Sequence, residues 1–146
     1  MKNDCLFHFH VPYENGTLEA VSYDANGREI SRNALTTAGE ETMLRAVPEQ
    51  ETVQAGHLCY IRLQYTDRNG IVKPCERGIL DVSVTGGKLV GLGSACPYYE
   101  LDYRGSRADA YYGEALAIVE ADTEGTMTLN VSDGKQIATV SVEVQA

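Results

Sequence analysis

The sequence predicts an all-β protein: an immunoglobulin-like antiparallel β-sandwich preceded by a short β-meander. First, apolar and polar residues alternate over many short segments, as they do in strands that bury one face. Second, turn residues such as Asn-Gly and Asp-Gly separate these segments at intervals of about eight to twelve residues. Third, no segment has the apolar spacing of an amphipathic helix. We therefore expect two packed sheets rather than a mixed fold.

The N-terminal residues 1–39 are predicted to form the meander. Residues 5–11 alternate strictly, and residues 17–23 and 28–35 flank an Asn-Gly turn at Asn26. Three strands are too few to bury a core of their own. This region is therefore either an edge of the main domain or the end of a preceding β domain.

Residues 40–146 are predicted to form the sandwich. The segment 115–119 is apolar on both faces, which is typical of a central strand, and we expect Ile118 to be fully buried there. The strands are expected at residues 42–47, 57–66, 78–84, 88–92, 115–119, 127–131 and 137–144.

One long connection interrupts the sandwich, and its residues 97–113 are rich in tyrosine and acidic side chains. Tyrosine rings can stack on sugar rings while carboxylates bind sugar hydroxyls, so this loop is a candidate for contact with a glycan or a protein partner. In the alternative interpretation the tyrosines pack the loop onto the sandwich. The candidate residues are Tyr98, Tyr99, Glu100, Asp102, Tyr103, Tyr111 and Tyr112.

Composition and spacing argue against several classes of function. The net charge of −9 disfavours a nucleic-acid partner. No apolar run approaches the ~18 residues of a membrane span, and the N-terminus lacks a signal-peptide pattern, so we expect a soluble and cytoplasmic protein. Gly91-Leu-Gly93 is not followed by the third glycine and helix of a dinucleotide site. We expect no cofactor.

The sequence contains no arrangement typical of a catalytic or metal site. Ser94 is not in a nucleophile elbow, and no histidine lies beside it in the sequence. His8 and His10 share a strand face, but a metal site needs a third ligand. The four cysteines are too scattered for a metal finger, and we expect them to be buried as small apolar residues rather than paired in disulfides: Cys5, Cys59, Cys75 and Cys96.

Two groups of motifs resemble one known family. Residues 11–23 read VPYENGTLEAVSY and are followed by NGRE and TTAG. Residues 91–97 read GLGSACP, and residues 112–121 read YGEALAIVEA. In this order the motifs resemble the region that follows the catalytic barrel in bacterial family 2 glycoside hydrolases of the β-galactosidase type. The likeness covers nearly the whole chain.

The resemblance implies that this chain is a C-terminal, non-catalytic accessory domain of a larger glycosidase. It also implies that residues 1–39 are the closing strands of a truncated preceding β domain. In that family two glutamates on a TIM barrel act as acid/base and nucleophile, so the resemblance assigns no catalytic residue to this chain. It implies that the partners are the barrel and the preceding domains of the parent enzyme, or a second copy in a homo-oligomer. Two alternatives stay open, namely a carbohydrate-binding module that uses the 97–113 loop and a bacterial immunoglobulin-like spacer or adhesion domain.

Overall fold

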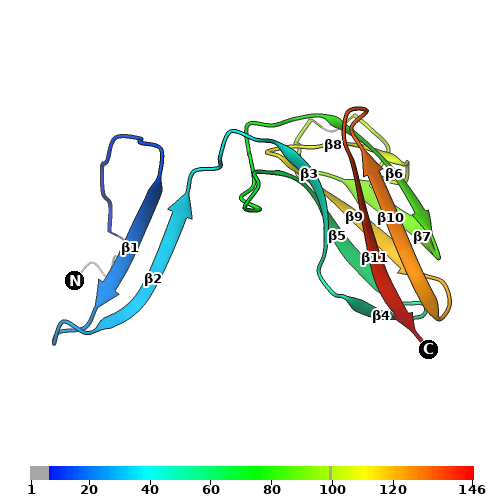
Figure 1. Cartoon of the computed structure of the whole chain (residues 1–146), viewed down its shortest axis with the longest axis horizontal. Coiled ribbons are helices and arrows are strands. Elements are labelled where there is room, and N and C mark those ends of the chain that lie inside the picture. The colour runs from blue at the N-terminus through cyan, green and yellow to red at the C-terminus, as the bar shows by residue number, and fades with distance from the viewer. Residues whose placement is uncertain (1–6, 99) are drawn as a thin grey trace. The chain divides into compact units, whose positions relative to one another are not determined.

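The computed structural model describes residues 7–98 and 100–146 (Figure 1). The chain divides into two compact units, Met1–Thr37 and Ala38–Ala146, which are described separately. None of the described residues is helical, and the strands form three antiparallel or mixed sheets. The prediction of an all-β fold is confirmed.

The described residues of the first unit form one antiparallel hairpin of β1 (Thr17–Tyr23) and β2 (Glu29–Thr36). Gly27 has a φ of +79°, which suits the Asn-Gly turn expected here. The expected strand at residues 5–11 is wrong for residues 7–11, which belong to no strand, and its first two residues lie outside the described part. Alternation gives a segment a strand-like pattern, but the strand forms only where a neighbour completes the hydrogen-bond ladder. The predicted meander is therefore a hairpin.

The described part of the first unit leaves most of its large apolar side chains exposed to solvent. Two strands cannot bury a core, so this exposure follows from the size of the sheet. That residues 1–39 are the closing strands of a truncated domain stays a prediction. The exposed side chains include Phe7, Phe9, Tyr13, Leu18, Ile30 and Leu35.

The second unit is a sandwich of two sheets (Figure 1). The four-stranded sheet has the order β3 (Met43–Pro48), β5 (Leu58–Thr66), β9 (Glu114–Ala121) and β7 (Gly87–Gly93). The five-stranded sheet has the order β4 (Thr52–Gln54), β11 (Ile137–Gln145), β10 (Gly125–Ser132), β6 (Ile79–Thr85) and β8 (Arg107–Asp109). Without β4 and β8, the two sheets have the ABED and CFG composition of an immunoglobulin-like domain.

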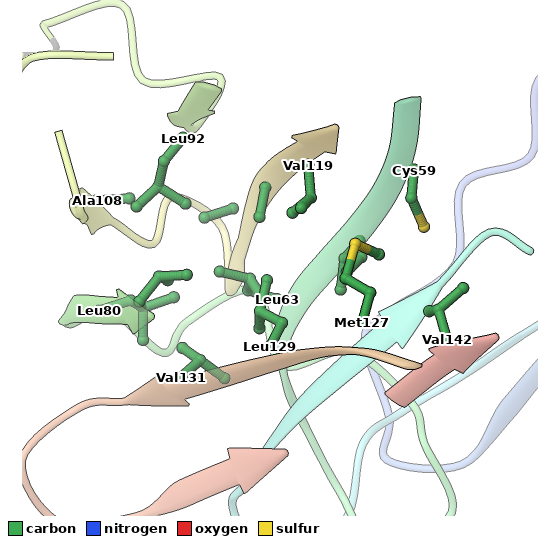
Figure 2. Close-up of a cluster of buried hydrophobic side chains, with 14 of the residues drawn as sticks. Cys59, Leu63, Leu80, Leu92, Ala108, Val119, Met127, Leu129, Val131 and Val142 are labelled. Atoms are coloured by element: carbon green, nitrogen blue, oxygen red, sulfur yellow. The ribbon is translucent and has the colours of Figure 1, made fainter. Parts of the chain in front are cut away.

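The core lies between the two sheets and is built from alternate residues of each strand (Figure 2). β5, β9, β10 and β11 point every second side chain inward, so the period of two seen in the sequence is the period of burial. The largest side chains that are fully buried include Ile61, Leu63, Leu80, Leu92, Met127, Leu129 and Val131.

The expectation that Ile118 is fully buried is wrong. β9 is a central strand, paired with β5 and β7. Its inward residues, however, are the small ones, Ala115, Ala117, Val119 and Ala121, and Ile118 is half-buried on the outer face. Both faces of β9 carry apolar residues, so the sequence alone did not identify the inward set.

Two strands of three residues were not predicted. β4 pairs parallel with β11, and β8 lies inside the long connection and pairs with β6. Three residues carry too little alternation for a periodic signal, and both strands exist because a longer strand offers them a free edge. β8 divides the connection that we expected to be irregular throughout.

Two aspartates fix turns of the sandwich by accepting backbone hydrogen bonds. Asp67 is buried, and its carboxylate accepts the N–H groups of Gly39, Asn69 and Ile71. These bonds, that of Gly39 first, lower the pKa of Asp67. Burial by itself would raise the pKa of Asp133, but hydrogen bonds from the Gln136 and Lys135 N–H groups and from Tyr65 lower it overall.

β7 forms one edge of the four-stranded sheet. A bulge between Leu89 and Gly91 interrupts its register with β9. The N–H of Leu92 donates to the carbonyl of Tyr103, 2.8 Å away in the long connection. The connection is thus tied to the edge strand by a backbone hydrogen bond.

Candidate functional site

The outer face of the four-stranded sheet carries a trough of about 640 Å³, which we call the trough throughout. Its floor comes from β7 and β9, and its walls come from β5, from the start of β9 and from the long connection. All the lining residues belong to the second unit: Glu49, Arg62, Gly91, Leu92, Gly93, Ser94, Ala95, Tyr103, Tyr111, Tyr112, Glu114, Ala115, Leu116 and Ile118.

The floor is hollow because two glycines face outward in β7. The strand register places Gly91 opposite Ile118 and Gly93 opposite Leu116. The two glycines carry no side chain, so the outer face is lower along β7 than along β9. The half-buried aliphatic chains of Leu116 and Ile118 make this floor apolar.

The ring of Tyr103 lies against Gly93. A Cβ atom at position 93 would be 2.4 Å from Cδ1 and 2.5 Å from Cε1 of that ring. The contact distance therefore allows only glycine at this position if the ring is to keep its place. One side of the Tyr103 ring is held by the floor, and 53% of the residue surface stays exposed.

A two-residue turn, Tyr112-Gly113, connects Tyr111 to Glu114 at the start of β9. The N–H of Tyr111 donates to the carbonyl of Glu114, and the N–H of Glu114 donates back to Tyr111. The two central residues, Tyr112 and Gly113, have φ values of +51° and +78°, as in a type I′ turn.

Tyr112 is strained in this turn. Type I′ turns favour Asn, Asp or Gly at the first central position, and an aromatic residue with positive φ costs about 1–2 kcal/mol. The second central position requires glycine, because Gly113 has a positive φ and a Cβ atom there would clash with the carbonyl oxygen of Lys73. The rings of Tyr111 and Tyr112 meet edge to face, with centroids 4.5 Å apart and planes at 72°.

Polar groups flank the aromatic rings. The carboxylate of Glu114 accepts a hydrogen bond from the side-chain amide of Gln64. Arg62 and Glu49 are exposed at the β5 side of the trough. Hydrogen bonding with the Tyr112 side chain, followed by burial, raises the pKa of Tyr111, so the Tyr111 hydroxyl keeps its proton at neutral pH.

The structure brings three of the seven predicted contact residues into the trough, namely Tyr103, Tyr111 and Tyr112. Three others are exposed and do not line it. Of these, Tyr98 is 86% exposed, Glu100 is also exposed, and Asp102 accepts the N–H of Arg104 in a turn. Tyr99 lies outside the described residues.

Sequence reasoning missed the strand residues of the trough, chiefly Arg62, Leu116 and Ile118. A signal was available in Gly91 and Gly93, which are two residues apart and therefore face the same side of a strand. Asp109, another acidic residue of the long connection, forms an ion pair with Arg77, which lies just before the start of β6.

The remaining candidates are placed elsewhere. Cys59 and Cys96 are buried and free, as expected, whereas Cys75 is exposed, so the expectation of burial is wrong for that residue; Cys5 lies outside the described part. His8 and His10 are exposed, and residues 7–98 and 100–146 contain no cluster of three or more His, Cys, Asp or Glu side chains that could hold a metal ion. Ser94 accepts the N–H of Cys96 at 3.4 Å.

Comparison with protein-family models decides the family. Residues 44–143 match the model of the glycoside hydrolase family 2 C-terminal domain 5. The chain belongs to this family. Residues 1–31 match a second model, which is described as a domain of unknown function, DUF4982. No match was found among curated protein sequences.

Solved structures share the fold of this family 2 C-terminal domain. A glycosyl hydrolase family 2 member from Bacteroides cellulosilyticus matches 92% of the chain with a TM-score of 0.82 and 24% identity. A β-glycosidase from Bacteroides vulgatus matches 92% with a TM-score of 0.80 and 24% identity. A family 2 β-glucuronidase matches 92% with a TM-score of 0.77 and 19% identity. The aligned region is 19%, 18% and 15% of the length of those three chains.

These coverages show that the family 2 C-terminal domain is one part of much longer enzymes. At such identities the likeness establishes the fold alone. The part of the chain that the structure describes has no helix that could span a membrane.

Proposed function

We propose that this chain is a non-catalytic accessory domain of a family 2 glycoside hydrolase whose parent enzyme acts on β-galactosides. The observation that carries the proposal is the family match over residues 44–143, in a chain that aligns with 19% or less of the enzymes with the same fold. The chemistry of such an enzyme then belongs to another region of the parent chain.

Chain length supports the non-catalytic role. The resemblance described above implies that the two catalytic glutamates stand on a TIM barrel, which needs about 250 residues. A chain of 146 residues that is already folded into a hairpin and a sandwich cannot contain one. The trough does hold two glutamates, Glu49 and Glu114, but Glu114 is engaged by Gln64 on the open face of a sheet.

The preference for β-galactosides rests on the resemblance of the two groups of motifs in order, namely those at residues 11–39 and those at residues 91–97 and 112–121. The solved structures with this fold include proteins named β-glycosidase and β-glucuronidase, so the substrate of the parent is a separate question from the role of the domain. Specificity in a glycosidase is determined around the catalytic carboxylates, which lie outside this chain.

Two assays test the proposal. The purified chain is incubated with nitrophenyl β-galactoside, and we expect no turnover above the buffer rate. The full-length parent is then assayed with nitrophenyl β-galactoside and nitrophenyl β-glucuronide, and we expect the galactoside to be hydrolysed with the higher kcat/KM. Turnover by the chain that survives repurification would contradict the non-catalytic role, and a preference for the glucuronide would contradict the substrate.

An immunoglobulin-like spacer or adhesion domain is the alternative with the same fold. The reading frame that encodes the parent distinguishes the two. A barrel domain encoded upstream supports the accessory role, and tandem immunoglobulin-like repeats support the spacer.

A further inference from the structure

We propose that the trough is a binding site for a neutral oligosaccharide, in which Tyr103 and Tyr112 contact the faces of the sugar rings and Arg62 and Glu114 bind the hydroxyl groups. This goes beyond the accessory role, which needs no sugar contact outside the catalytic barrel. The argument rests on the shape of the trough, on the conformation of Tyr112 and on the balance of charge.

The first argument compares the two outer faces of the sandwich. The outer positions of β10 and β11 in the five-stranded sheet are mainly polar, with Thr128, Asn130, Thr139 and Ser141 hydrogen-bonded to one another in pairs. The trough instead has an aliphatic floor and an aromatic rim. The apolar faces of pyranose rings pack against such surfaces, while the ring edges carry the hydroxyls.

The second argument is the conformation of Tyr112. The positive φ of Tyr112 destabilises the folded state, whereas Asn or Gly would adopt the same φ at a smaller cost in free energy. Tyr112 remains 65% exposed, so the packing of its ring in the sandwich does not compensate for this strain. Strained residues of this kind are concentrated at binding sites, where the backbone holds a side chain in position before the ligand arrives. The turn presents the Tyr112 ring at the rim of the trough.

The third argument is that the aromatic groups are already held in place. Tyr103 lies against Gly93, and Tyr111 supports Tyr112 edge to face. Binding costs free energy when mobile side chains must become ordered around the ligand. Because these rings are already held in place, a ligand that contacts them avoids part of that cost. This arrangement is unlike a loop whose tyrosines are buried for packing alone.

The charge of the trough favours a neutral ligand. The trough is lined by one guanidinium, that of Arg62, and by two carboxylates, those of Glu49 and Glu114, in a chain of net charge −9. Carboxylates accept hydrogen bonds from hydroxyl groups, and guanidinium donates to hydroxyl oxygens. An acidic sugar such as a glucuronide would be repelled by the two glutamates.

The test is a titration of the 146-residue chain with a neutral galacto-oligosaccharide, in which binding is measured by ¹H–¹⁵N NMR and by calorimetry. We expect saturable binding at millimolar concentrations, with shifts confined to the trough. Glucuronic acid is the charged control and should bind more weakly. Absence of saturation at tens of millimolar sugar would overturn the proposal.

Tyr112→Gly is the decisive variant, because it separates binding from stability. Gly relieves the positive φ, so we expect the melting temperature of this variant to be unchanged or higher, while sugar affinity falls about tenfold. Tyr98→Ala removes a more exposed tyrosine outside the trough and should leave the affinity unchanged. Equal affinity of Tyr112→Gly and the original chain, or an equal loss in Tyr98→Ala, would overturn the assignment.

Docking of a second protein domain is the competing use of the same face. Hydroxyl-radical footprinting of the full-length parent enzyme, with and without the oligosaccharide, distinguishes the two because it reports the solvent exposure of side chains. Protection of the exposed rings of Tyr103 and Tyr112 that appears only with sugar supports the proposal. Protection of the same residues without sugar, to a level that sugar does not increase, would show a domain interface and overturn it.

Discussion

The hydroxyl of Tyr65 donates a hydrogen bond to the carboxylate of Asp133 over 3.1 Å. Tyr65 belongs to β5 in the four-stranded sheet, and Asp133 lies in the turn between β10 and β11 of the other sheet. The bond therefore joins the two layers of the sandwich through a buried ring. Burial, followed by this bond to a carboxylate, raises the pKa of Tyr65, so the hydroxyl keeps its proton.

Tyr65→Phe should lower the free energy of unfolding by about 1–2 kcal/mol. The substitution keeps the buried ring and removes one hydrogen bond to a charged acceptor. Asp133 still accepts the N–H groups of Lys135 and Gln136, so the turn itself should persist. Urea denaturation followed by circular dichroism measures the change. Tyr60→Phe, at a half-buried position of the same strand, is the control, and an equal effect of the two would contradict the role of the bond.

Leu63→Ala should cost more stability than Ile118→Ala, although both residues lie on central strands. Leu63 is fully buried between the sheets, and its truncation leaves a cavity that costs about 2–5 kcal/mol. Ile118 is half-buried at the floor of the trough, where water can occupy the space, so about 1–2 kcal/mol is expected. Urea midpoints of the two variants decide the order, and the reverse order would mean that the faces of β9 are wrongly assigned.

Gly93→Ala should displace the ring of Tyr103, whereas Gly91→Ala should not. A Cβ at position 93 would be 2.4 Å from the ring, but at position 91 its closest contact would be Ile118 at an ordinary 3.6 Å. We expect a cost of about 1 kcal/mol for Gly93→Ala, because the outer side of the ring faces solvent and the ring can move. The aromatic NMR signals of Tyr103 report the displacement directly. Unchanged signals in Gly93→Ala would contradict the contact.

The sandwich should lose stability in acid through Asp67 and Asp133. The native state lowers the pKa of both carboxyl groups, so each contributes stability above its unfolded pKa of about 3.9. That contribution is lost as the pH falls through the lowered native value. We therefore expect little change in the urea midpoint between pH 7 and 5 and a clear fall between pH 4 and 2.

Asp67→Asn tests the assignment of this acid sensitivity. The amide cannot ionise, so the variant should be less stable than the original chain at pH 7 and should lose less stability on acidification. If its urea midpoint falls with pH as steeply as that of the original chain, then Asp67 is not one of the groups responsible.

The sandwich was predictable because its long strands repeat a simple pattern. In β10 and β11 one face is apolar and the other polar, so the inward set can be identified without a structure. In β9 both faces are apolar, and the inward set is the one with the smaller side chains, which hydrophobicity does not distinguish. Strands of three residues, such as β4 and β8, depend on the edge of a neighbour and leave no period in the sequence.

The trough could be predicted only in part, for a related reason. The tyrosines of the loop were visible as a composition, and three of the seven candidates do line the trough. Its floor is formed by residues of β7 and β9 that lie on the same face of the sheet. The bulge in β7 inserts one extra residue and so shifts the alternation of inward and outward side chains by one position, which the sequence does not reveal. The positive φ of Tyr112 is a property of the folded turn. In the sequence the only indication of a turn at this place is Gly113.

The hydrogen bond from the Leu92 N–H to the Tyr103 carbonyl has a consequence for the behaviour of the domain in solution. An exposed edge strand invites the strand of another chain to pair with it, which is a common start of aggregation. At β7 the long connection occupies one of these donors, and the bulge at Gly91 breaks the regular spacing that a foreign strand would need. The segment that forms the wall of the trough therefore also protects the sheet against self-association.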